Sequence, residues 1–209
     1  MPMDSTIRKM ERMVREGGEG RVWFPSDFFE CGSEKAVSKA LQRLVGEEVL
    51  MRMTRGLYCS PTESRWGMGK LPAGADDVIK AIAAREGFKI GPAPGEALNS
   101  LGLSDDVVMN PVYTTDGPSR SIHYRDNRRP IYLYHIPPKF FNFKSHIMML
   151  AAIALNDIGK EHLWEVEFDR MEEIFSRVPY AEIRDDLRMT PVWMRDLILG
   201  FYGKQSKKS

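Results

Sequence analysis

The sequence has no long hydrophobic run. Its longest uninterrupted apolar stretch is Ile147 to Leu155, nine residues, whereas a membrane-spanning helix needs about 20. The stretch therefore predicts a buried helix, with a dimer interface as the alternative use, and no membrane partner is expected. The N-terminus, Met1 to Asp4, also lacks the positively charged segment, followed by an apolar segment, that begins a secretory signal peptide.

Cysteine and histidine are too scarce and too scattered for a disulfide framework or a metal site. Cys31 and Cys59 form no CxxC pair, which favours a cytosolic, reducing location. The four histidines show none of the HxH, HxxxH or HExxH spacings that bring ligands together. We therefore expect no metal and no cofactor.

Neither sign of charge is in excess. The chain has 30 Lys and Arg against 29 Asp and Glu, a formal net charge of +1. This excludes a polycationic coat for nucleic acid but leaves room for a local basic face. The 209 residues, 43% of them hydrophobic and 28% charged, are typical of a globular protein with one core or two small domains.

The first sixty residues predict a compact order of elements. These are a helix carrying Ile7, Met10 and Val14, a short strand over 21–24, a short helix through Phe28 and Phe29, a helix over about 34–45, and a hairpin with strands 49–53 and 57–59. The order, with two helices joined by a turn and followed by a hairpin, is typical of a winged helix-turn-helix.

The helix over 34–45 separates its residues into two faces. An apolar side carries Val37, Ala40, Leu41 and Leu44. The opposite side carries cations, a hydroxyl and an amide, which are Lys35, Ser38, Lys39, Gln42 and Arg43. Lys and Arg bind phosphates or guanine and Gln pairs with adenine, so we expect this face to bind the DNA major groove.

The hairpin after this helix predicts a basic wing. Arg52 lies on its first strand and Arg55 in its turn, where both can contact a phosphate backbone. Because the turn is only Thr54-Arg55-Gly56, its reach is short, and phosphate contact is expected rather than insertion into the minor groove. Two alternatives stay open: these charges are simply solvated, or the unit binds a partner protein instead of DNA.

The rest of the chain predicts a second, mixed domain. Residues 61–75 are rich in turn formers and are expected to be a linker. The region 76–209 predicts helices, β-like runs over 107–115, 119–124 and 131–136 joined as hairpins, and C-terminal helices over 145–158, 167–178 and 180–199, the last with a break at Pro191. The fold class is therefore α+β: a winged helix-turn-helix over 1–60, a linker over 61–75, and an α+β domain over 76–209 with a small antiparallel sheet.

No catalytic constellation is visible in this second region. It has no glycine-rich phosphate loop and no GxSxG elbow. The carboxylate pairs Glu172-Glu173 and Asp185-Asp186 are adjacent on predicted helices and do not converge, so we expect solvated faces and no enzyme.

A cluster of arginines and tyrosines lies near the predicted hairpins. The arginines are Arg120, Arg125, Arg128 and Arg129, and the interleaved tyrosines are Tyr113, Tyr124, Tyr132 and Tyr134. Cations among aromatics on a sheet can bind nucleic acid or an acidic protein. The alternative is a curved sheet whose tyrosines cover a core while the arginines are solvated.

Three stretches of the first half resemble a known family. Residues 22–28 (VWFPSDF), 36–44 (AVSKALQRL) and 52–58 (RMTRGLY) resemble the winged-helix domain of AbiEi-type antitoxins, and a related group of DUF6088-type proteins shares the pattern. Residues 95–103 (GEALNSLGL) and 112–117 (VYTTDG) resemble the segment that follows the wing in that group. The likeness covers nearly the whole chain, with its clearest motifs between residues 20 and 120.

The resemblance implies a transcriptional autorepressor that is also the antitoxin of a type IV toxin–antitoxin system. Its partners would be operator DNA and, functionally, a nucleotidyltransferase-like toxin that it need not contact directly; a homodimer is left open. By matching position, the resemblance places Lys35, Ser38, Lys39, Gln42 and Arg43 in the groove, and Arg52 and Arg55 in the wing.

Overall fold

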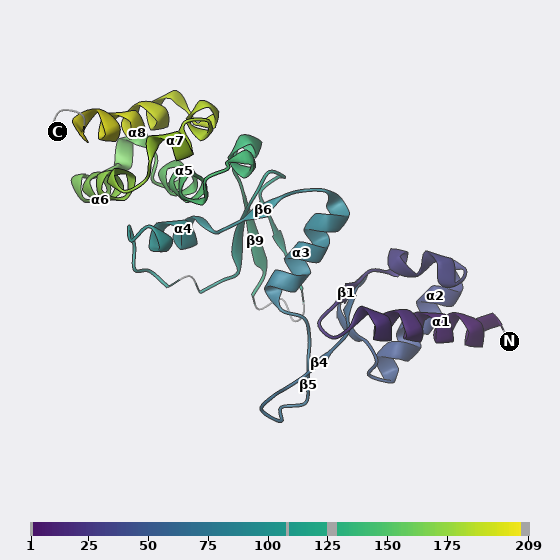
Figure 1. Ribbon diagram of the computed structural model, residues 1–209. Coiled ribbons are helices and arrows are strands. Elements are labelled where there is room, and N and C mark those ends of the chain that lie inside the picture. The colour runs from purple at the N-terminus through teal and green to yellow at the C-terminus, as the bar shows by residue number, and fades with distance from the viewer. Residues whose placement is uncertain (1, 108, 125–128, 206–209) are drawn as a thin grey trace. The chain divides into compact units, whose positions relative to one another are not determined.

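The protein has a mixed α+β structure, here a computed structural model that describes residues 2–107, 109–124 and 129–205 (Figure 1). The chain divides into two compact units. The first unit comprises residues 1–87 and 122–131, and the second comprises residues 88–121 and 132–209. Within the described residues, every helix is too short or too polar to span a bilayer.

The first unit begins with the predicted order of elements. These are α1 (Pro2–Gly17), β1 (Val22–Trp23), the 3-10 helix η1 (Pro25–Cys31), α2 (Glu34–Gly46), β2 (Met51–Thr54) and β3 (Leu57–Cys59). The strands form a three-stranded antiparallel sheet in the order β1-β3-β2. Helix α1 packs against α2 and η1 (Figure 1).

The core of this unit is built from the apolar faces that the periodicity predicts. Ile7, Met10 and Val14 of α1 are buried together with the apolar side of α2. Trp23 is 1% exposed and stacks on Phe28, with ring centroids 5.2 Å apart. Its indole Nε1 donates to Ser60 Oγ at 2.9 Å, which ties β1 to the residue after β3.

The first unit extends beyond residue 60. A short antiparallel hairpin, β4 (Thr62–Glu63) and β5 (Lys70–Leu71), lies within the span predicted to be a linker. It is followed by α3 (Ala75–Glu86), which buries Val78, Ile79, Ile82 and Ala83. The Arg85 guanidinium lies over the Phe24 ring, 4.3 Å from its centroid, so α3 is joined to the first unit by a cation–π contact.

The four-stranded sheet of the remaining chain is mixed, and the predicted antiparallel arrangement is wrong. Its strands are β6 (Ile90–Gly91), β7 (Val112–Thr115), β8 (Arg120–Ile122) and β9 (Ile131–His135), in the order β6-β7-β9-β8. Strand β7 pairs in parallel with β9 and not with β8, the strand that follows it in the sequence. Burial explains the order, because Ile131 and Leu133 make β9 the apolar strand, whereas the polar β8 suits an edge.

Helices make up most of the remaining chain. They are α4 (Pro94–Ser100), η2 (Pro138–Asn142), α5 (His146–Ile158), η3 (Lys160–His162), α6 (Glu165–Ser176), α7 (Tyr180–Ile183), η4 (Asp186–Met189) and α8 (Val192–Gln205). Seven of the nine residues from Ile147 to Leu155 are buried in the main core, which confirms that this stretch of α5 is a core helix. It packs in a group with α6 and α8 (Figure 1).

The single helix predicted over 180–199 is interrupted twice: after Ile183, and again at Pro191, where a break is predicted. Helix α7 ends at Ile183, and the following residues turn Asp186 into the interior, where it is 0% exposed. Its carboxylate accepts the backbone N–H of Lys144 at 3.0 Å and that of Ser145 at 2.8 Å, at the start of α5. The expectation that Asp186 is solvated is therefore wrong, because its carboxylate accepts the backbone N–H groups of Ser145, the N-cap of α5, and of Lys144 before it.

Tyr202 of α8 makes the stability of the protein sensitive to alkaline pH. Its hydroxyl donates to the Val178 carbonyl at 2.8 Å, and burial, with smaller contributions from Glu182 and Tyr180, raises its pKa to about 12. This folded-state pKa lies above the usual value of 10.0. The protonated Tyr202 hydroxyl therefore contributes fully to the stability of the fold below pH 10, and this contribution is lost as pH rises through 12. Titration of tyrosinate absorbance should show one late-titrating group that Tyr202→Phe removes. A wild-type curve identical to that of the variant would contradict the assignment.

Candidate nucleic-acid interface

Helix α2 is set firmly into the first unit by its cap and its apolar side. Ser33 precedes it in an extended conformation, and its Oγ accepts the Ala36 N–H at 3.4 Å. Val37, Ala40, Leu41 and Leu44 are all buried, so the rotation of the helix about its axis is fixed. The opposite face must therefore point to solvent.

The five residues predicted on the polar face of α2 are all exposed: Lys35, Ser38, Lys39, Gln42 and Arg43. The three cations follow one another at intervals of four residues, which aligns them along one line of the helix surface. Ser38 and Gln42 lie beside that line, each three residues after a cation. The structure thus brings cationic and hydrogen-bonding groups together on a surface one helix wide.

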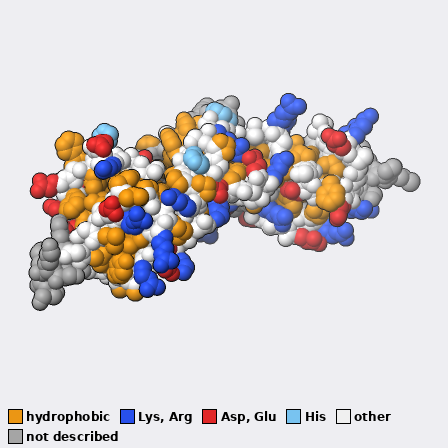
Figure 2. Space-filling model, turned by 90° about the horizontal axis from the view of Figure 1, so that it is seen from above, with side chains coloured by type: hydrophobic (Ala, Val, Ile, Leu, Met, Phe, Trp, Pro, Cys, Tyr) orange, Lys and Arg blue, Asp and Glu red, His pale blue; other side chains and the backbone are white. Residues whose placement is uncertain are grey.

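An acidic residue next to α2 limits the charge of this face. Arg43 Nε lies 2.7 Å from Glu47 Oε1, with the two side chains 53% and 42% exposed. Figure 2 shows blue cationic and red acidic side chains interspersed over the visible surface. The surface therefore agrees with the near-neutral composition, and any selective binding depends on local arrangement rather than on bulk charge.

The β2–β3 hairpin carries the two arginines predicted for the wing. Arg52 is exposed on β2, and its Nε donates to the Thr54 carbonyl at 3.4 Å. Arg55 is exposed in the turn, where Gly56 adopts a left-handed conformation with φ of 76°. The register shifts between Arg52 and Thr54, and Thr54 pairs with Leu57 across a two-residue turn, so this hairpin is short.

The turn between η1 and α2 is closely packed. A Cβ added to Gly32 would lie 2.6 Å from Thr6 Oγ1, so only glycine allows α1 to approach this turn so closely. The neighbouring Cys31 is buried, and burial raises the pKa of its thiol. This thiol therefore stays protonated at neutral pH and serves as a small core group.

The predicted arginine–tyrosine cluster is only partly described. Arg120 is exposed, with its guanidinium 5.3 Å from the centroid of the Phe88 ring. Arg129 is also exposed but falls in the first unit, whereas Arg120 falls in the second. Arg125 and Arg128 lie outside the described residues. Tyr134 is 52% exposed and the other three tyrosines are half-buried.

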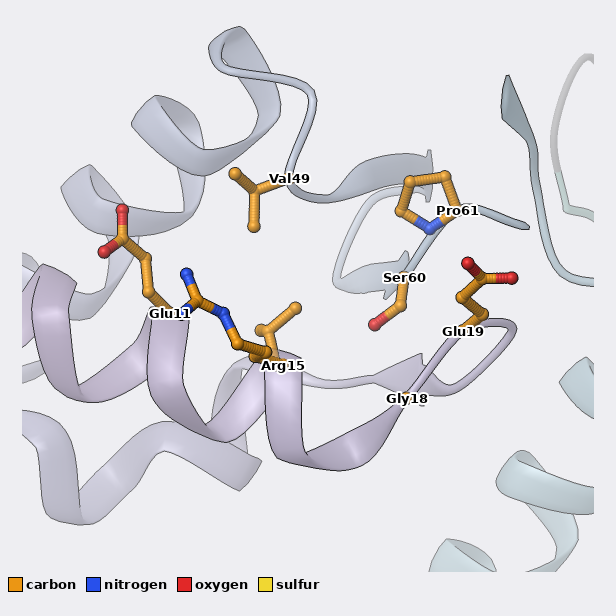
Figure 3. Close-up of a pocket in the computed structure, with 8 residues that line it drawn as sticks. Glu11, Arg15, Gly18, Glu19, Val49, Ser60 and Pro61 are labelled. Atoms are coloured by element: carbon orange, nitrogen blue, oxygen red, sulfur yellow. The ribbon is translucent and has the colours of Figure 1, made fainter. Parts of the chain in front are cut away.

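A hollow of about 360 Å³ lies elsewhere on the first unit (Figure 3). Glu11 and Arg15 of α1 line one side of it, and Val49, Ser60 and Pro61 line the other. Ser60 Oγ is engaged by the Trp23 indole, so it anchors the core beneath the hollow. Over the residues that the structure describes, no group of three or more His, Cys, Asp or Glu is placed to hold a metal ion.

The β4–β5 hairpin adds side chains that reasoning from the sequence missed. Its tip exposes Trp66 and Met68, and Arg65 and Lys70 flank them on the chain. The mixture of aromatic, thioether and cationic side chains among glycines was the available signal. Turn formers dominate residues 61–75, and their abundance favours a linker.

Comparison with known proteins places most of the chain in one family. Residues 9–183 match DUF6088, described as a family of unknown function. No match was found among curated proteins or among solved structures.

Proposed function

Since this chain belongs to the DUF6088 family, whose function is unknown, we propose from its own residues that it is a DNA-binding transcriptional autorepressor. Its first unit would be a winged helix in which α2 enters the major groove and the β2–β3 hairpin is the wing. The order of elements and the β1-β3-β2 sheet support this fold.

One observation carries the proposal: the exposed face of α2. It presents Lys35, Lys39 and Arg43 in one line beside Ser38 and Gln42, on a helix whose other side is locked into the core. Cations in a line suit phosphates and guanine acceptors, and the amide suits adenine. Arg52 and Arg55 would then contact the backbone of the flanking DNA.

The resemblance to AbiEi-type antitoxins supports a second part of the proposal. The protein would counteract a nucleotidyltransferase-like toxin and would not require direct contact with it. The test is co-expression with the product of a neighbouring gene: a toxin expressed alone should arrest growth, and this chain should restore it. Absence of a nucleotidyltransferase-like neighbour would remove the toxin–antitoxin part and leave DNA binding in place.

Binding to DNA from upstream of its own gene should weaken steeply as salt increases. Each phosphate contact releases condensed counterions, so the slope of log K against log salt is about −0.9 per contact. With five cations on α2 and the hairpin, we expect a slope between roughly −3 and −5. Fluorescence anisotropy of a labelled duplex at several salt concentrations measures it.

A slope of log K against log salt near zero would contradict the DNA-binding proposal. A matched duplex of unrelated sequence serves as the control for selectivity, because non-specific binding follows the same salt law with lower affinity. Failure to bind either duplex would favour the alternative in which the first unit binds a partner protein.

A further inference from the structure

Exposed apolar side chains of the first unit gather on the β4–β5 hairpin. Among its described residues, the large hydrophobic side chains left exposed are Phe29 of η1 and three on this hairpin. Trp66 is 85% exposed, Met68 is 68% exposed and Leu71 is 39% exposed. We call residues 62–71 the arm.

The tip of the arm is a tightly bonded loop. Ser64 N donates to the Gly69 carbonyl at 2.9 Å, and Gly67 N donates to the Ser64 carbonyl at 3.2 Å. Gly67 and Gly69 adopt left-handed conformations with φ of 68° and 77°, which lets the chain reverse within this short span. The backbone that carries Trp66 and Met68 is thus held in a defined loop, so binding has less backbone entropy to remove there than in an open loop.

The arm is positively charged and tied to the end of α2. It carries Arg65 and Lys70 against one acidic residue, Glu63, and Lys70 Nζ lies 3.5 Å from Glu48 Oε2. Lys70 Nζ donates to the carbonyl of Glu48, two residues after α2, at 2.9 Å. A hollow of about 600 Å³ is lined by Arg52 of β2, by Gly69 and Lys70 of the arm, and by the acidic residues Glu48 and Glu63. The arm and the β2–β3 hairpin therefore border the same surface.

We propose that the arm is a second DNA-contacting element, which places Trp66 and Met68 into the minor groove beside the site bound by α2. The inference rests on the DNA-binding function proposed above. The β2–β3 turn has only two residues and is too short to enter the groove, whereas the arm ends in two apolar side chains. Apolar wedges of this kind enter between base steps from the minor groove, while neighbouring cations contact the phosphates.

Charge and size favour DNA over a second copy of this chain. Two copies of the arm carry the same net positive charge, from Arg65 and Lys70 against Glu63, so a two-fold contact between arms gains no overall charge complementarity. The tip also presents few residues, whereas a stable protein interface buries about 1,200 Å² or more. A polyanion with stacked bases satisfies both the cations and the aromatic ring.

The test replaces Trp66 and measures binding of a 30-base-pair duplex from upstream of the gene. Trp66→Ala should weaken binding about tenfold, because aromatic contacts with bases contribute on that scale. Trp66→Phe should retain most of the affinity. The matched control is Trp164→Ala, which removes an indole that is 72% exposed in the second unit and should leave affinity unchanged.

Base-pair replacement tests the groove. Exchanging A·T for I·C pairs beneath the arm keeps the minor-groove pattern and alters the major-groove pattern, so the loss caused by Trp66→Ala should persist on that duplex. Sedimentation of wild type and variant should give the same mass. A variant with unchanged affinity, or one whose weaker binding follows from loss of a dimer, overturns the arm proposal.

The outcomes separate this inference from the function on which it depends. If Lys39→Ala and Arg43→Ala weaken binding and Trp66→Ala does not, DNA binding stands and the arm proposal fails. If the wild-type protein binds no DNA, both fail together.

Discussion

Replacing Lys39 and Arg43 together with alanine is expected to weaken operator binding roughly 30- to 1000-fold at constant salt. Two cations on a groove-facing helix contribute about 1–2 kcal/mol each through phosphate or base contacts, and about 1.4 kcal/mol corresponds to a tenfold change. The salt slope should become shallower by about 2. Anisotropy titrations at three salt concentrations measure both quantities.

The two positions are not expected to contribute equally. Arg43 is paired with Glu47 at 2.7 Å, so part of its charge is already compensated and Lys39→Ala should be the more damaging single change. Both side chains are exposed, so the melting temperature should stay near that of the wild type.

A charge-matched control separates local contact from net charge. Lys139 and Lys160 are exposed lysines of the second unit, and replacing both with alanine removes the same total charge. This control should bind DNA nearly as tightly as the wild type. Equal losses in the two double variants would mean that overall charge, and not the face of α2, governs binding.

Asp186→Ala should be strongly destabilising. The carboxylate is 0% exposed and accepts backbone N–H groups of Lys144 and Ser145 at the start of α5. Its loss leaves these donors unsatisfied at the end of the central helix, and we expect the free energy of unfolding to fall by about 2–4 kcal/mol. Denaturant unfolding monitored by circular dichroism checks this value.

The neighbouring carboxylate provides the control. Asp185 is exposed and contacts Lys144 Nζ at 3.1 Å, and this contact lowers the pKa of its carboxyl group. Asp185→Ala should change stability little, because solvent screens an exposed ion pair. Asp186→Asn keeps one acceptor oxygen and should fall between wild type and Asp186→Ala. Equal effects at 185 and 186 would show that the buried cap does not stabilise α5.

The elements of the first sixty residues could be predicted because their information is local. The buried Val37, Ala40, Leu41 and Leu44 recur at helical spacing, and this spacing alone fixes which side of α2 faces solvent. The exposed positions of Lys35, Lys39 and Arg43 follow from the same periodicity.

The arm could not be predicted in the same way. Its strands have two residues each, too few for any alternation of polar and apolar residues to be visible. Their pairing depends on the turn and on the bond from Lys70 to Glu48, 22 residues earlier. A glycine-rich sequence permits a linker and a tight hairpin equally, and only contacts made after folding distinguish them.

The sequence by itself determined the α+β composition, the order of elements over the first sixty residues and the polar face of α2, because periodicity and turn residues act between near neighbours. Only the tertiary structure decided the strand order of the four-stranded sheet, the burial of Asp186 and the exposure of Trp66. These features depend on which distant segments compete for the interior. Strand β9 takes the position beside β7 because it is more apolar than β8. Asp186 is buried beside the backbone amides of Lys144 and Ser145, which need an acceptor just before α5 begins.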